Sequence, residues 1–312
     1  MLSTARINDL VLAAARQSDA AAVVAVASRD RERAESYAVE HGIERAHGSY
    51  EALLGDPDVE AVYISLPNSL HVEWTIRALE AGKHVLCEKP FDKRPEEVER
   101  AFDVAERAGL VLMEAFMYRH HPQTRKLEEV VRSGAIGELR QLRTSFSFLL
   151  DDPENVRLRP ELDGGAVMDL GCYCISNCRL LAGEPELVFG RQHVGPTGVD
   201  VRFNGFLQFP GPVFAEFDCA FDLPEDTGFE AIGSEGAVVV SDPVRIRDPH
   251  LLLNGERIDV EDVDRYLLQI ENFSAAVRGE VAPLLGRDDA LGQARVIDAL
   301  YRSAGSGAAV SL

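Results

Sequence analysis

The chain has 312 residues, a formal net charge of −20 and a hydrophobic fraction of 46%. This length predicts two domains rather than one core. The acidity disfavours nucleic acids and anionic membrane surfaces as partners, because both attract basic proteins. In chain order, the first elements that we expect are a turn of small residues at 3–8 and a helix at 9–16.

Residues 20–115 alternate between apolar strands and helices. The predicted strands are 21–27, 60–66, 83–87 and 110–114. Helices follow three of these strands, and two of the helices, 69–81 and 95–108, end at a glycine, a common stop signal. Continuous apolar strands joined by helices specify a parallel sheet that is covered on both faces. We therefore predict an α/β, Rossmann-like, doubly wound dinucleotide-binding domain over residues 1–120.

The pattern changes in residues 121–312, where short strands joined by turns predominate. The predicted strands are 139–148, 186–194, 199–209, 212–222, 227–232 and 236–240. The predicted helices are 122–133, 168–182, 262–279 and 288–304. Turns such as Pro210-Gly211 between the strands indicate an open, mainly antiparallel sheet. This half is expected to be an α+β domain that binds substrate and mediates oligomerisation.

Ligands of an open parallel sheet collect beyond the carboxyl ends of its strands. The strand that ends at residue 27 is followed by Ser28, Arg29 and Asp30, with Arg33 one turn later. Small and cationic residues here favour the 2′-phosphate of NADP, whereas Asp30 would suit the ribose hydroxyl of NAD. NADP is the preferred cofactor and NAD stays possible.

Two further turns follow predicted strands. Leu66-Pro67-Asn68 leads to His71; Asn68 could cap the next helix, or the turn could face the nicotinamide end of a cofactor. Glu88-Lys89-Pro90 places a charged pair directly after a buried strand, and the proline would aim Lys89. A surface Glu–Lys pair and an active-site lysine are both open interpretations of this turn.

In the second domain, Gly164-Gly165 precedes a predicted helix that carries Asp169, Tyr173 and Asn177. Their spacing puts the three on one helical face, where Asp169 and Tyr173 could form a proton-transfer pair. The alternative is an acid favoured by the helix dipole beside a half-buried tyrosine. Three cysteines on the same helix lack zinc-finger spacing, so no metal site is expected.

Five motifs occur in order along the chain. They are Ser-Thr-Ala-Arg-Ile-Asn at 3–8, Leu-Pro-Asn-Ser-Leu-His at 66–71, Gly-Lys-His-Val-Leu-Cys-Glu-Lys-Pro at 82–90, Glu-Ala-Phe-Met-Tyr-Arg at 114–119 and Gly-Gly-Ala-x-x-Asp-x-Gly-Cys-Tyr at 164–173. Together they resemble the glucose–fructose oxidoreductase/inositol dehydrogenase (Gfo/Idh/MocA) family over essentially the whole chain. Tyr173, where other members carry histidine, is similar to the branch of dihydrodiol dehydrogenases, NADP-dependent xylose dehydrogenases and glucose–fructose oxidoreductase.

The resemblance implies an NADP-dependent dehydrogenase that moves hydride between cofactor and a hydroxyl of a sugar, polyol or cyclic diol. It implies Lys89 as the active-site lysine, and Asp169 and Tyr173 as substrate contact and acid/base. The residues expected to contact the cofactor are Ser3, Thr4, Ala5, Arg6, Ile7, Ser28, Arg29, Arg33, Leu66, Pro67, Asn68, His71, Glu88, Lys89, Pro90 and Arg119. A homodimer or homotetramer through the C-terminal sheet is implied as well. A non-catalytic regulatory protein and an NAD-dependent glycosidase remain alternatives.

Two expectations concern the compartment and the first residues. Five cysteines, an odd number, and charges within the first twenty residues indicate a cytoplasmic protein without a signal peptide. Ser3, Ala5 and Asn8 fall where the family's phosphate-binding turn has glycines. Met1 and Leu2 would then end the first strand, whose earlier residues we expect to be missing through a late start or a truncation. A natural variant with a weakened pyrophosphate site is the alternative.

Overall fold

The structure, a computed structural model, describes all residues from 1 to 312. Its internal contacts divide the chain into two units. The first unit comprises Met1–Met117 and Asp264–Leu291, and the second comprises Tyr118–Val263 and Gly292–Leu312. The predicted boundary at 120/121 lies close to this division. Residues 264–291, which were expected in the second domain, belong to the first unit.

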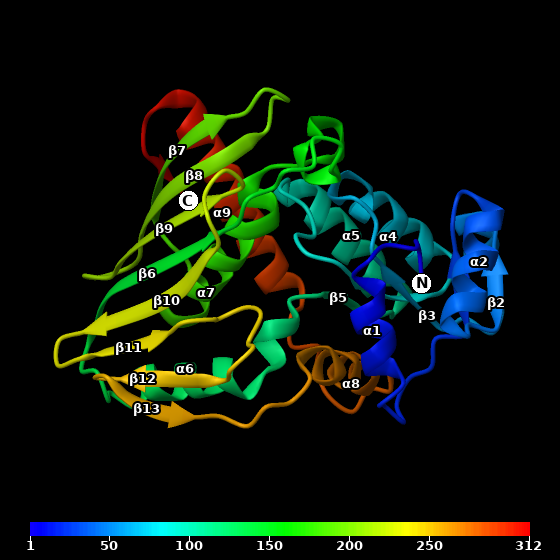
Figure 1. Cartoon of the computed structure of the whole chain (residues 1–312), viewed down its shortest axis with the longest axis horizontal. Helices are drawn as coiled ribbons and strands as arrows, with labels where there is room; N and C mark the ends of the chain where they lie inside the picture. Colours follow the sequence, from blue (N-terminus) through cyan, green and yellow to red (C-terminus); the bar gives the residue numbers. More distant parts are fainter. The chain divides into compact units, whose positions relative to one another are not determined.

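The first unit contains five short parallel strands (Figure 1). They are β1 (Ala25–Ala27), β2 (Arg45–His47), β3 (Ala61–Ile64), β4 (His84–Cys87) and β5 (Leu112–Glu114). The pairs form two separate groups, β1-β2 and β3-β4-β5. Leu2 alone connects the groups, because it pairs in parallel with Ala27 on one side and with Ile64 on the other.

The first unit also contains six α-helices. They are α1 (Asn8–Ala15), α2 (Arg31–His41), α3 (Tyr50–Leu54), α4 (His71–Glu80), α5 (Pro95–Ala108) and α8 (Arg265–Val277), with a 3-10 turn at Asn68–Leu70. Helix α5 begins with proline at its first position, has two glutamates in its first turn and stops at Gly109 in the left-handed conformation. The parallel strands and interspersed helices confirm the predicted Rossmann-like class.

One strand is much shorter than predicted. The apolar run 21–27 forms a strand only over Ala25–Ala27, and residues 21–24 are partly or fully exposed. A central strand needs partners on both edges, and Leu2 supplies a partner only near the end of this run. The composition therefore predicted a buried strand correctly in type, but wrongly in length.

The second unit is built on a nine-stranded sheet in the order β13-β12-β11-β10-β6-β9-β8-β7-β14. All neighbours are antiparallel except the parallel pair β6–β9. The strands are β6 (Leu139–Ser147), β7 (Leu187–Val194), β8 (Asp200–Gln208), β9 (Phe214–Ala220), β10 (Asp226–Gly233), β11 (Ala237–Val240), β12 (His250–Leu253), β13 (Glu256–Asp259) and β14 (Val310–Ser311). The last three were not predicted, and neither were β2 and α3.

Helices pack on one face of this sheet (Figure 1). They are α6 (Pro122–Arg132), α7 (Cys172–Ala182) and the part of α9 (Arg287–Ser306) from Gly292 onward, and 3-10 turns lie at Met117–His120, Val156–Leu158 and Pro160–Leu162. The predicted helix 168–182 instead begins as a π-helix, Val167–Gly171, which continues into α7. The cysteines of α7 are buried small residues of the core, as expected. None of the helices combines the length and apolar character that a bilayer crossing requires.

Candidate active site and cofactor-binding residues

The turn between Leu2 and α1 is the segment predicted to contact the cofactor's pyrophosphate. Its residues, 3–7, are half-buried or exposed, and the turn leads into the amino end of α1. Ser3 has a φ of 129°, a conformation that favours glycine. Its hydroxyl contacts the Ser65 hydroxyl at 2.8 Å, and the Asn8 amide donates to the Ser3 carbonyl at 2.8 Å. Polar side chains thus hold a turn that glycines usually form.

The residues after β1 combine one carboxylate that is engaged as a helix cap with two exposed guanidinium groups. Asp30 accepts a hydrogen bond from the Arg33 amide at 3.2 Å and so caps α2. Arg29 and Arg33 are exposed. Burial raises the pKa of Tyr50, whereas the charges of Arg29, which bonds its hydroxyl, and of Arg33 oppose that rise. Two guanidinium groups therefore lie near one phenol at this edge of the sheet.

His71 lies in the interior of the first unit. It is fully buried, with Nε2 2.8 Å from the Leu66 carbonyl and Nδ1 2.9 Å from the Pro90 carbonyl. Burial lowers its pKa, although both contacts oppose the shift. His71 thus joins two of the predicted cofactor turns to each other, and its ring nitrogens are already occupied. Asn68 opens a 3-10 turn, and Leu70, the residue directly before α4, provides no side-chain cap.

The Glu88-Lys89-Pro90 turn is held from two sides. The Tyr63 hydroxyl donates to Glu88 Oε1 at 2.6 Å, and Glu114 Oε1 accepts from the Phe91 amide at 2.8 Å. The Lys89–Pro90 peptide bond is cis, and Lys89 itself is half-buried. Tyr63 and Glu114 were not predicted as site residues. Both residues lie in strands that were predicted from the sequence. Their contacts with this turn were not predictable, because the partners are distant in sequence.

In the second unit, Tyr173 lies in the first turn of α7 and is buried. Its ring centroid is 5.8 Å from that of Tyr118 and 5.9 Å from that of Phe146. Arg119, predicted to contact the cofactor, donates to the Ser176 hydroxyl of the same helix at 3.2 Å. The structure thus brings Tyr173 and Arg119 to neighbouring parts of α7.

Asp169 is positioned differently from the prediction. It lies in the π-helix, so the α-helical spacing that would place it on one face with Tyr173 and Asn177 does not hold there. Arg157 Nε donates to Asp169 Oδ2 at 2.6 Å. The Asp169 side chain is 14% exposed and that of Arg157 is 41% exposed. Arg157 was missed because it comes from a segment without periodic pattern.

Asp200 holds the start of this π-helix in place. Its Oδ2 accepts from the Val167 amide and its Oδ1 from the Tyr301 hydroxyl, both at 2.8 Å. Gly165 has a φ of 127°, and a Cβ there would lie 2.2 Å from Asp200 Oδ1. Only glycine fits this position, which explains one of the two glycines in the motif. Asp200 escaped prediction, because an acid at the start of a strand carries no local signal.

Asp200→Asn is expected to change how stability depends on pH. Burial raises the pKa of Asp200 to about 6, above its unfolded value near 3.8. The protonated form therefore favours folding, and this contribution, up to about 3 kcal/mol, is lost as pH rises from 4 through 6. Relative to Asp200→Asn, the free energy of unfolding of the native chain should fall by up to about 3 kcal/mol between pH 4 and pH 6. Urea unfolding at a series of pH values measures this difference.

Asp222→Asn is the matched control, because Arg202 lowers the pKa of Asp222 by a hydrogen bond. Relative to Asp222→Asn, the free energy of unfolding of the native chain should therefore rise, not fall, as pH increases. If the Asp200→Asn difference stayed constant from pH 4 to 7, the account of a buried, titrating Asp200 would be wrong.

Two family models match the chain. The oxidoreductase family with an NAD-binding Rossmann fold, GFO/IDH/MocA, matches residues 4–116, and the GFO/IDH/MocA C-terminal domain matches residues 124–239. The chain belongs to the GFO/IDH/MocA family. The sequence resemblance is thereby confirmed, and so is the two-part α/β and α+β architecture that it implied.

Relatives of this chain include several sugar and diol oxidoreductases. A D-xylose 1-dehydrogenase (NADP(+)) from Haloferax volcanii is 38% identical over 100% of this chain and 98% of its own length. A trans-1,2-dihydrobenzene-1,2-diol dehydrogenase from Mus musculus is 36% identical over 75% of this chain and 70% of its own. A 3-ketoreductase from Actinomadura kijaniata, solved with NADP and TDP-benzene, has a TM-score of 0.91 and 33% identity, covering 97% of this chain and 96% of that one.

Proposed function

We propose that this chain is an NADP-dependent dehydrogenase that oxidises a secondary or anomeric hydroxyl of a sugar, polyol or cyclic diol. The observation that carries the proposal is the presence of Lys89, Asp169 and Tyr173 at the family's motif positions in one chain. Full-length similarity to an NADP-dependent xylose dehydrogenase supports the substrate class. A regulatory protein on the same fold would have no need of an acid/base pair.

The residues present fit a dinucleotide. The turn 3–7 at the amino end of α1 would hold its pyrophosphate, since helix amino ends attract anions. Arg29 and Arg33, beside Tyr50, would hold the 2′-phosphate, while Asp30 is already engaged as a helix cap. The residues 66–68, 88–90 and Arg119 are proposed to line the nicotinamide end, with His71 as a support rather than a contact. When bound, the nicotinamide accepts the hydride.

Tyr173 is proposed to accept the hydroxyl proton of the substrate as its carbon is oxidised. A free phenol has a pKa near 10, so a neighbouring cation must favour its anion at neutral pH. Lys89 is proposed to supply that charge. Asp169, held by Arg157 at 2.6 Å, is proposed to orient the substrate hydroxyl. In this assignment the phenol transfers the proton, the lysine supplies positive charge and the carboxylate positions the substrate.

Arg29→Ala is expected to weaken NADP binding by about 10- to 100-fold, because a charge-assisted contact with phosphate contributes about 1.5–3 kcal/mol. NAD binding should change little, because NAD lacks that phosphate. Fluorescence titration of both cofactors measures the difference. Arg31→Ala is the control, since Arg31 is exposed and pairs with Glu35 at 2.8 Å. Equal losses for NADP and NAD would refute the phosphate contact.

A substrate panel tests the proposed reaction. Aldoses, inositols and cyclic diols are each mixed with the chain and NADP or NAD, and reduced nicotinamide is followed by absorbance. Net reduction with a sugar or diol supports a dehydrogenase. Bond cleavage in a glycoside with cofactor that is recycled would identify the glycosidase alternative. Cofactor binding without turnover of any compound would favour the regulatory alternative.

We also propose a homodimer or homotetramer through the open sheet of the second unit, in the cytoplasm. Phe206 of β8 and Phe214 of β9 stack at 5.5 Å and are 37% and 42% exposed. Exposed aromatic residues on one sheet face are typical of an interface. Sedimentation of the native chain and of Phe206→Ser distinguishes the assembled from the monomeric state.

A further inference from the structure

The π-helix that carries Asp169 is closed by a hydrogen bond across five residues. The Cys172 amide donates to the Val167 carbonyl, whereas an α-helix would use the carbonyl four residues back. The turn therefore holds one residue more than an α-helical turn. Gly171 lets this wider turn approach the sheet, because a Cβ there would lie 3.0 Å from Cys219 Sγ. Such turns are rare and occur frequently at functional sites.

Two buried polar side chains hold the residues that close the π-helix. Asp200 Oδ2 accepts from the Val167 amide at 2.8 Å, and Gln293 Nε2 donates to the Cys172 carbonyl at 2.7 Å. Asp200 is 4% exposed and Gln293 is 2% exposed, so both hydrogen bonds are made in the interior. Each satisfies a backbone group at one end of the π-helix. We call this pair of contacts the clamp.

The orientation of the Gln293 amide follows from its second partner. Arg179 Nη1 donates to Gln293 Oε1 at 3.0 Å. A guanidinium can only donate, so the amide oxygen faces Arg179 and the amide NH2 group faces the Cys172 carbonyl. Arg179 is itself buried, and Glu184 accepts from it at 2.9 and 2.6 Å. A Cβ at Gly292 would lie 2.1 Å from Arg179 Nη2, so glycine lets α9 come this close.

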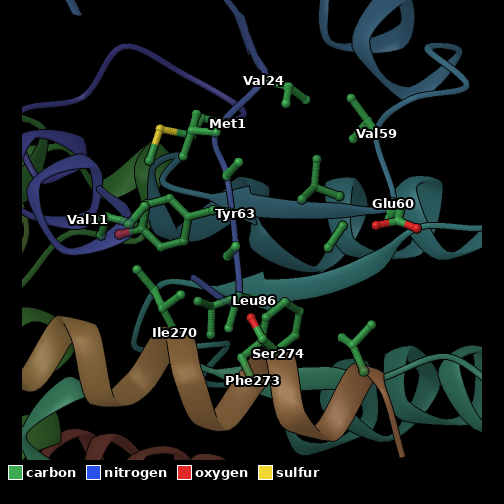
Figure 2. Close-up of a pocket in the computed structure, with 18 of the residues that line it drawn as sticks. Met1, Val11, Val24, Val59, Glu60, Tyr63, Leu86, Ile270, Phe273 and Ser274 are labelled. Atoms are coloured by element: carbon green, nitrogen blue, oxygen red, sulfur yellow. The ribbon is translucent and has the colours of Figure 1, made fainter. Parts of the chain in front are cut away.

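Gln293 comes from the last part of the chain. Helix α8 belongs to the first unit, where its Ile270 lines a pocket together with Leu86 of β4 (Figure 2). Helix α9 begins in the same unit, and its residues from Gly292 onward belong to the second unit. Gln293 thus reaches Cys172 across 121 residues of sequence. This separation explains why no local pattern marks the contact.

We propose that Gln293 is a positioning residue of the proposed active site. The clamp that it forms with Asp200 maintains the π-helix, and the π-helix sets the direction of Asp169 relative to Tyr173. Tyr173 directly follows Cys172, where the π-helix ends. If the extra residue were lost and the turn became α-helical, Asp169 would rotate by about 100° relative to Tyr173, the angle of one residue in an α-helix.

The Asp169 carboxylate would then point away from the substrate hydroxyl that it is proposed to orient. The effect of Gln293 on catalysis rests on the proposed function. Its effect on the π-helix does not, because the two hydrogen bonds of the clamp are independent of any substrate.

Gln293→Glu tests the clamp. Glutamate keeps the size of the side chain and an oxygen for Arg179, but its carboxylate cannot donate to the Cys172 carbonyl. Gln123→Glu is the matched control. Gln123 is also 2% exposed, donates through Nε2 to the Asp242 carbonyl at 3.0 Å and accepts a backbone hydrogen bond through its oxygen. Both variants lose one buried hydrogen bond to a carbonyl, so both should have a lower Tm.

Gln293→Glu is expected to speed amide hydrogen exchange of residues 168–172 by about 10-fold or more, because one end of the π-helix is released. It should lower kcat/KM on the best substrate of the panel by about 10- to 100-fold, since a small misplacement in an active site has effects of this size. Gln123→Glu should leave both quantities close to native. NADP affinity should stay close to native in both variants, because the proposed phosphate contacts belong to the first unit.

A double-mutant cycle with Asp169→Asn separates positioning from a general loss of stability. If Gln293 acts through Asp169, adding Gln293→Glu to Asp169→Asn should lower kcat/KM by less than about 2-fold more. A full further loss in the double variant would overturn the proposal, and so would equal exchange at 168–172 in the two glutamine variants. Native-like kcat/KM in Asp169→Asn would overturn it through the proposed function, because Gln293 would then have no catalytic partner. The exchange measurement needs no substrate and so distinguishes these failures.

Discussion

Tyr173→Phe is expected to lower kcat by about 10²- to 10⁴-fold, the usual loss when a general acid/base is removed. The substitution deletes only the hydroxyl, so the ring contacts with Tyr118 and Phe146 stay in place. The Tm should therefore change little. Steady-state assay on the best substrate of the panel measures the effect, with cofactor affinity as a check that the site is intact.

Tyr37→Phe is the matched control for this variant. Tyr37 lies on α2, and its hydroxyl donates to Asp9 at 3.2 Å in an exposed hydrogen bond, away from the residues proposed for catalysis. Turnover of Tyr37→Phe should equal that of the native chain. Native-like kcat in Tyr173→Phe would remove Tyr173 from the chemistry and would require another proton acceptor.

Lys89→Met is expected to lower kcat by about 10²-fold or more, because the phenol of Tyr173 loses the cation that favours its anion. Methionine keeps most of the apolar stem of lysine, and Glu88 stays bonded to Tyr63. The limb of the pH–rate profile that reports Tyr173 should move upward, towards the pH near 10 of a free phenol. Rates from pH 6 to 10 measure both effects.

Lys126→Met is the control, since Lys126 pairs with Glu129 at 2.8 Å on α6. It should leave both the rate and the pH profile unchanged. A Lys89→Met chain with reduced kcat but an unmoved pH profile would assign Lys89 to binding rather than to the state of Tyr173.

Elements with complete local signals were predictable from the sequence. Helix α5 begins at Pro95 and ends before Gly109 as expected, because proline, first-turn acids and a left-handed glycine each act within one turn. The class of sheet was predictable from apolar strands that alternate with helices. The turn that carries Lys89 could be located because it follows the buried strand β4, which ends at Cys87.

Features that depend on distant partners were not predictable. The strand at 21–27 is short because it pairs with β2 only over Ala25–Ala27 and, on its other edge, only with Leu2. The π-helix around Asp169 is held by Asp200, which lies 31 residues later and carries no motif. His71 is a buried support because two turns supply carbonyls to it, a fact of tertiary structure alone.

The most direct test of the proposed function is the absorbance of reduced nicotinamide when the native chain is mixed with NADP and D-xylose or a trans cyclic diol. We expect reduced cofactor to accumulate with at least one compound of the panel, and to accumulate more slowly with NAD. A folded chain that binds NADP but reduces none of it with any sugar, polyol or diol would contradict the proposal.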